Sequence, residues 1–181
     1  LSVLYSYEKQ TAFDVDSDIN LSVDYGSGVS TSLTPVVTWD SRDSPFIPTK
    51  GQFYSLRMKN SSDLFGAQLN YYRLESDYRI YHQLTDFWLI AGALRGGRIW
   101  AVHGEKELPL SERFFPGGAN TNRGFSEKEL GSGSANSRPL GGLSYFLTNL
   151  EARFPLWKSI YGGVFVDAGN AYLTTPEPPY L

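Results

Sequence analysis

The stretch from Leu108 to Phe125 holds the residues whose types and spacing point most clearly to a specific chemical role. Arg123 is surrounded there by aromatic residues and glycines. These neighbours are Phe114, Phe115, Gly117, Gly118, Gly124 and Phe125. Aromatic rings would anchor the chain and glycines would let it turn sharply, so we predict an ordered, buried loop. A buried guanidinium needs an anionic partner, so the predicted chemistry is ion pairing.

This stretch lies within a long polar connection that we place at residues 102–141. A connection of about forty residues inside a compact fold is usually either functional or disordered. The anchors around Arg123 favour the functional interpretation.

Other candidate sites are weaker. Asp14, Asp16 and Asp18 resemble the start of a calcium loop, but Ile19 occupies the glycine position and Tyr25 the position of the last glutamate. A solvated acidic loop explains this run better.

The two histidines, His82 and His103, have no glutamate between them at metal-ligand spacing, and no Gly-x-Ser-x-Gly elbow is present. The glycine-rich run from Gly131 lacks the Lys-Ser/Thr of a phosphate loop. We therefore predict no metal, no cofactor and no enzymatic activity in this chain.

Composition narrows the class of protein. The 181 residues carry 16 Lys and Arg against 19 Asp and Glu, and this balance argues against binding to nucleic acid. Mean hydropathy is −0.30 and no apolar stretch reaches the roughly 18 residues of a membrane helix, which excludes helical membrane proteins. Membrane β-barrels stay open because their strands alternate. There is no cysteine, so a disulfide framework is excluded.

Apolar residues recur mainly at every second position, which predicts an all-β fold. The seven strands that we expect lie at 1–7, 29–40, 52–59, 65–72, 87–100, 144–154 and 160–172. Several of these reach the 9–11 residues with which a tilted strand crosses a bilayer.

Each strand has two different faces. Arg57, Arg95, Glu151, Arg153 and Asp167 place charges at strand middles on one face. The other face is rich in Tyr, Trp, Phe and Leu, with tryptophans near the strand ends. A soluble β-sandwich would turn the charged face to solvent, whereas a membrane barrel would turn it to a wet lumen. The pattern favours the barrel over the sandwich.

The connections alternate in length. The turns at 41–51, 84–86 and 157–159 are compact, whereas the connections at 9–28 and 102–142 are long and polar. Short turns at one end and long loops at the other are typical of outer-membrane barrels, although a sandwich can also carry one long loop.

Four motifs resemble those of a known family, the outer-membrane protein assembly factors (the BamA/TamA-like surface antigen superfamily). They are Thr38-Trp-Asp-Ser-Arg-Asp-Ser-Pro45 with Pro48-Thr-Lys-Gly51, Phe115-Pro-Gly-Gly118 with Arg123-Gly-Phe125, Gly141-Gly142 with Asn149-Leu-Glu151 and Phe154-Pro155, and Val164-Phe-Val-Asp-Ala-Gly-Asn-Ala171. Their order and approximate spacing agree with the family from about residue 30 to 172. One departure is Asn122, where many relatives have an apolar residue.

The resemblance implies a barrel of about sixteen strands whose sixth external loop folds back into the lumen. Arg123 at the Arg-Gly-Phe tip would then pair with Asp167, and also with Glu151, on the lumenal wall. The alternation independently places Glu151 on the polar face of its strand, and Asp167 on the face opposite Val164, Val166 and Ala168.

The resemblance also implies a domain organisation. Residues 1–181 would form part of one barrel domain, about seven strands of it. The periplasmic repeat domains and the first and last strands would be absent, so the piece would not span a membrane stably alone.

The function implied is the folding and insertion of β-barrel proteins into the outer membrane of a Gram-negative bacterium or, second, of an organelle. Its partners would be the lipid bilayer, substrate barrel or passenger proteins, and periplasmic or lipoprotein components. Alternatives within the family are a two-partner secretion or autotransporter-assembly translocator and the barrel of a patatin-like lipase. A passive porin and a soluble β-sandwich rank last.

Overall fold

A computed structural model describes residues 2–10, 28–102, 108, 110–131, 134–135, 138–158 and 160–173. The acidic run at Asp14–Asp18 and His103 lie outside these residues.

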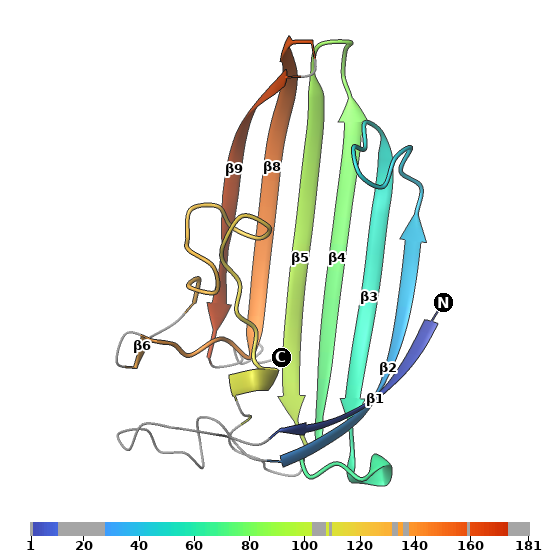
Figure 1. The fold of residues 1–181 in the computed structure, drawn as a ribbon, viewed down its shortest axis with the longest axis vertical. Helices are drawn as coiled ribbons and strands as arrows, with labels where there is room; N and C mark the ends of the chain where they lie inside the picture. Colours follow the sequence, from blue (N-terminus) through green and yellow to red (C-terminus); the bar gives the residue numbers. More distant parts are fainter. Residues whose placement is uncertain are drawn as a thin grey trace, which may run out of the picture.

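The predicted all-β antiparallel fold is confirmed. One sheet contains seven strands in the order β1-β2-β3-β4-β5-β8-β9, each antiparallel to its neighbours, and a short hairpin β6-β7 lies apart from it (Figure 1). The strands are β1 (Ser2–Gln10), β2 (Gly28–Asp40), β3 (Gly51–Ser61), β4 (Tyr71–Gln83), β5 (Leu89–Ala101), β6 (Ser134–Ala135), β7 (Arg138–Pro139), β8 (Ser144–Trp157) and β9 (Ile160–Tyr172).

One predicted strand is wrong. The segment 65–72 was expected to be extended, but Asp63–Phe65 forms a short 3₁₀ helix, η1, and the strand begins only at Tyr71. Ser62 caps the helix at its start, and Gly66 ends it in the left-handed conformation with φ of 82°. The apolar alternation of this segment therefore belongs to a loop.

β4 instead carries Arg73, Glu75, Asp77 and Arg79 at alternate positions, and these charges pair with one another and with a neighbouring strand. A strand with so much charge is stable here because its charges are partly exposed and paired with opposite charges.

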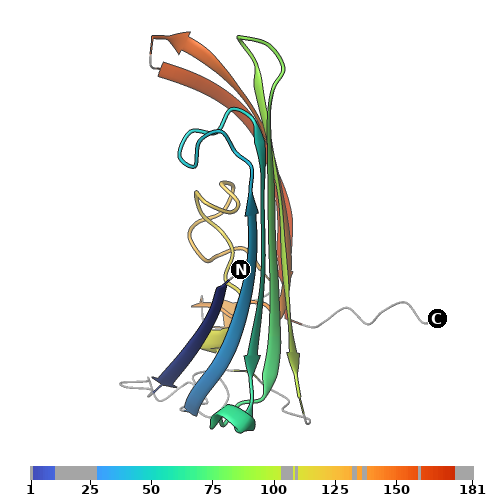
Figure 2. The same ribbon diagram turned by 90° about the vertical axis from the view of Figure 1, so that its right-hand side faces the viewer.

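The turns that join β2 to β3, β4 to β5 and β8 to β9 lie at one end of the sheet, and the β3–β4 connection with its short helix lies at the other (Figure 1). Seen edge-on, the turn between β2 and β3 and the β8–β9 hairpin both bend toward one side of the sheet, and the loop at 110–131 lies on that same side (Figure 2). This inner face carries most of the charged positions of β3, β4, β5, β8 and β9, whereas Arg98 of β5 lies on the other face beside Trp100. None of the described helices is long and apolar enough to cross a membrane.

The outer face carries most of the apolar positions, and none of the described segments packs over it. Large side chains there are well exposed, among them Trp39, Leu94, Leu150, Val164 and Val166. The main buried apolar cluster lies on the inner face instead, between the loop and the sheet. It consists of Tyr71, Ile99, Leu108 and Phe114, and we call it the base cluster.

Candidate functional site

The structure brings Arg123 together with both carboxylates that the sequence assigned to it. Its Nε and Nη2 donate to the two carboxylate oxygens of Asp167 at 2.8 and 2.7 Å, and its Nη1 donates to Glu151 at 2.6 Å. The backbone N–H of Arg123 also donates to Asp167, at 3.0 Å. We call this arrangement the tip clasp.

Strand pairing puts the two carboxylates within reach of one guanidinium. In the β8–β9 register Asn149 lies opposite Asp167 and Glu151 lies opposite Phe165. The side chains of all four therefore point to the inner face, two positions apart along their strands.

Two further residues complete the tip clasp. The amide of Asn149 donates to Asp167 and to the carbonyl of Thr121 in the loop, both at 2.8 Å. The ring of Phe165 lies beneath the guanidinium, with the centroid 3.4 Å from the central carbon, as in a cation–π contact. Asn149 lies two positions from Glu151, so the alternation predicts that it shares the polar face of the strand. Its role as a partner of Asp167 and the loop could not be predicted.

Charge is closely compensated at the tip clasp. The side chain of Asp167 is 4% exposed and that of Arg123 is 27% exposed. The carboxylate of Asp167, followed by that of Glu151, raises the pKa of the Arg123 guanidinium above its usual value. Arg153 donates to Glu151 from the other side at 2.6 Å. The guanidinium is thus a permanent cation, and the arrangement can hold the loop but cannot move a proton.

The glycines before the tip are required by its backbone. Gly117 and Gly118 have φ of 126° and 89°, and a Cβ on Gly117 would collide with the backbone of Ser126. Asn122 is buried, accepts from the N–H groups of Gly118 and Phe125, and its side chain accepts from Gly124. The residue that departs from the family pattern therefore caps the turn that presents Arg123.

The aromatic anchors divide into two kinds. Phe114 is buried against Tyr145 and Phe115 is half-buried, as expected of anchors. Phe125 was expected to anchor the loop as well, and this is wrong because its side chain is 48% exposed. The turn closed by the Asn122 carbonyl directs Arg123 to the wall and leaves Phe125 uncovered.

A polar cavity of about 230 Å³ lies between the tip and the wall. Arginines from three strands line it together with Arg123, namely Arg79, Arg95 and Arg153. Arg95 donates to the carbonyl of Asn120 at 2.8 Å, which adds β5 to the strands that hold the loop. Within the described residues, no group of three or more His, Cys, Asp or Glu side chains is placed to hold a metal ion.

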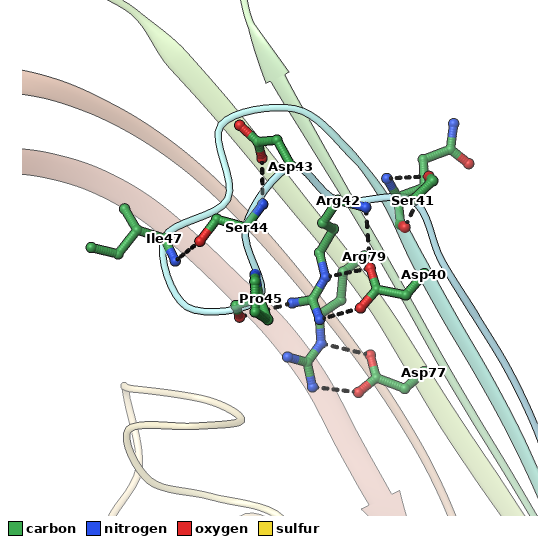
Figure 3. Close-up of polar contacts among 10 residues, drawn as sticks. Asp40, Ser41, Arg42, Asp43, Ser44, Pro45, Ile47, Asp77 and Arg79 are labelled. Carbon is green, nitrogen blue, oxygen red and sulfur yellow. Dashed lines mark hydrogen bonds and ion pairs between the residues drawn. The ribbon is translucent and has the colours of Figure 1, made fainter.

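The turn between β2 and β3, the first of the family-like motifs, is tied by its own side chains (Figure 3). Arg42 forms a two-pronged contact with Asp40 at 2.9 and 2.7 Å and donates to the carbonyl of Pro45. The guanidinium groups of Arg42 and Arg79 both lie near the ring of Phe53, at 4.8 and 5.4 Å from its centroid.

Across the same turn, Asp43 accepts from the hydroxyl and the N–H of Thr49 and from the N–H of Lys50. These hydrogen bonds lower the pKa of Asp43 well below its usual range, the Thr49 hydroxyl contributing most. These hydrogen bonds hold the turn in a defined conformation.

Proteins similar to this chain are known from Nitratidesulfovibrio vulgaris and from Homo sapiens. Outer membrane protein assembly factor BamA of Nitratidesulfovibrio vulgaris is 26% identical over 150 residues, which cover 81% of this chain and 19% of that protein. The sorting and assembly machinery component 50 homolog of Homo sapiens is 25% identical over 154 residues, which cover 80% of this chain and 32% of that protein.

The crystal structure of BamA from Haemophilus ducreyi lacking POTRA domains 1–3 has the same fold. It matches with a TM-score of 0.71 at 21% sequence identity, over 80% of this chain and 30% of that one. The chain thus spans about a fifth to a third of the length of the relatives it matches. The Omp85 superfamily domain matches residues 1–180, and the chain therefore belongs to the Omp85 superfamily.

Proposed function

We propose that this chain is part of the barrel of an outer-membrane protein assembly factor, which helps other β-barrel proteins to fold and insert into the membrane. Membership of the Omp85 superfamily supports this function, as does the similarity to the outer membrane protein assembly factor BamA and to a sorting and assembly machinery component. The observation that carries it for this chain is the tip clasp, in which Arg123 joins the loop to β8 and β9.

The physical principle is backbone pairing in a medium without water. Each peptide group left unpaired in lipid costs several kcal/mol, so an exposed strand edge favours the addition of an incoming strand. No bond is made or broken, and we assign no catalytic residue. The family alternatives, translocation of a passenger and the barrel of a lipase, would use the same wall and loop.

The loop would brace such a barrel from inside while its strands separate or accept a partner. Its contacts reach Arg95 on β5, Asn149 and Glu151 on β8 and Asp167 on β9. A brace that crosses several strands resists distortion of the wall that it covers.

The proposal includes a wider setting for the chain. The described strands would join others to close the barrel, periplasmic repeat domains would precede it, and residues 102–141 would form the loop on its lumenal side. The bilayer, substrate barrel proteins and periplasmic or lipoprotein components would be its partners, in a bacterial or organelle outer membrane.

The test is assembly of a second barrel protein by the full-length protein in lipid vesicles. Arg123→Ala should slow assembly roughly tenfold or more, because a buried carboxylate then lacks its partner. Arg57→Ala is the matched control, since Arg57 also points to the inner face but is exposed.

Heat-dependent gel mobility would show that each variant still forms a barrel. Normal assembly by a folded Arg123→Ala variant would contradict the proposed role. Normal assembly of the barrel substrate with failure to export a passenger would favour the translocator alternative.

A further inference from the structure

A second charged group of the loop is buried far from the tip. Glu112, at the end of the 3₁₀ helix η2 (Leu110–Glu112), is 2% exposed. Burial of a carboxylate to this degree is stable only when the charge is paired. The sequence offered no signal for it, because a lone acidic residue in a polar loop is ordinarily solvated.

The partners of Glu112 come from β3 and β4, two strands that supply no residue to the tip clasp. Lys59 on β3 donates from Nζ to both carboxylate oxygens, at 2.9 and 3.2 Å. Arg73 on β4 donates to the backbone carbonyl of Glu112 at 3.0 Å. We call these contacts the base clasp.

The base clasp lies against apolar packing. The guanidinium of Arg73 lies over the ring of Phe114, at 4.3 Å from the centroid, and the Lys59 ammonium lies 5.4 Å from the ring of Tyr71. Both rings belong to the base cluster. Ion pairing and apolar burial therefore act on the same few residues of the loop.

Hydrogen bonds to backbone groups join the two ends of the loop at its base. Phe114 and Gly142 exchange two hydrogen bonds of 2.9 and 2.8 Å, and Arg113 donates to the carbonyls of Leu108 and Leu140 at 3.1 Å each. The charged groups that hold the base therefore come from β3 and β4, and Phe114 also packs against Ile99 of β5 and Tyr145 of β8. The hydrogen bonds that hold the tip come from β5, β8 and β9.

We propose that Glu112 is a second positioning residue, which fixes the base of the loop through Lys59 and Arg73 independently of the tip clasp. The two clasps share no residue and no strand. Releasing Arg123 then frees residues 115–131 to swing while 108–114 stay docked. The tip of the loop can therefore move while its base stays bound to the sheet, and this does not depend on which protein the barrel handles.

Trypsin distinguishes the two ends of the loop, because it can cut after Arg113 in the base and after Lys128 near the tip. The substrate-free, full-length protein is digested in lipid, and the peptides from the two sites are quantified over time. In Arg123→Gln, cleavage after Lys128 should rise about tenfold or more while cleavage after Arg113 stays as slow as in the wild type.

The base clasp is tested by substitutions in β3 rather than in the loop, so that the sequence around the Arg113 cleavage site is unchanged. Lys59→Met should raise cleavage after Arg113 about tenfold or more. Lys59→Arg keeps the cation and should keep the protection. Arg57→Met, two positions away on the same face of β3, is the matched control and should behave as the wild type.

Equal exposure of both sites in Arg123→Gln would overturn the independence of the base. Continued protection of Arg113 in Lys59→Met would overturn the role of the ion pair. If Lys59→Met does not form a barrel, the Arg123→Gln comparison decides alone, because its base clasp is intact. Assembly activity is not used in this experiment, so its outcome is separate from that of the proposed function.

Discussion

The properties of arginine explain the geometry at residue 123. Three guanidinium nitrogens and the backbone N–H all donate, three of these four hydrogen bonds to Asp167 and one to Glu151. A planar group with donors on two edges can bridge two carboxylates and still lie flat on the ring of Phe165. A lysine ammonium has neither the shape nor the reach for this arrangement.

Arg123→Lys should therefore keep the charge but lose most of the bridging. We expect the barrel to unfold more easily by about 1–2 kcal/mol, with a smaller loss for a lysine control at exposed Arg57. Urea unfolding in detergent, followed by gel mobility, measures the difference. Equal stability of the Arg123→Lys variant and the wild type would show that charge alone is sufficient.

The elements could be predicted from the sequence to different degrees. β2, β3 and β8 alternate clearly, whereas β5 and β9 are largely apolar on both faces, and all five lie within a few residues of their expected places. The predicted position of β4 was wrong because its inward-facing residues are charged. The apolar alternation that served to find strands was present in the preceding loop instead. A charged strand can be predicted only when its neighbouring strands are known, because those strands supply the opposite charges. Here Arg95 of β5 is a cross-strand partner of Asp77.

The site was open to prediction only in part, for the same reason. Arg123, Asp167 and Glu151 stand in motifs that resemble a family, and alternation placed the acids on the inner face. Glu112 meets Lys59 across 53 residues of sequence, a contact set by strand register and loop folding. No local pattern marks a pair of that kind.

We expect the stability of the turn between β2 and β3 to depend on pH. Because the pKa of Asp43 is lowered in the folded turn, its hydrogen bonds contribute fully above the unfolded pKa of about 3.9 and are lost as pH falls through the lower folded value. Hydrogen exchange of residues 41–51 should therefore speed up, beyond the intrinsic pH effect, only well below pH of about 4.

Asp43→Asn removes the charge and serves as the reference. The protection that the wild type has over this variant should be constant at neutral pH and should disappear in strong acid. A difference that is unaffected by acidification would mean that the carboxylate charge does not stabilise the turn.

At the scale of the whole molecule, the two faces of the sheet differ in polarity. The inner face carries paired charges and the loop, whereas the outer face exposes large apolar side chains such as Val164 and Leu150. In an outer-membrane barrel, lipid would cover that outer face. In a soluble sandwich, these side chains would instead face water or a second layer.

Two adjacent residues of β3 separate these possibilities. Leu56 points outward with Met58, and Ser55 points inward with Arg57. Leu56→Arg should destabilise the barrel by about 2–4 kcal/mol near the middle of the bilayer, and Ser55→Arg should have a much smaller effect. Unfolding in lipid vesicles provides the comparison, and equal tolerance of both changes would argue against a membrane-facing outer surface.

A double-mutant cycle between Arg123 and Asp167 tests most directly whether the tip clasp is the working connection between loop and wall. Assembly rate and unfolding are measured for Arg123→Ala, Asp167→Ala and the pair in the full-length protein. The two residues form one connection, so the double variant should be no more impaired than the worse single variant in either measurement. Losses that add independently in both measurements would contradict the account.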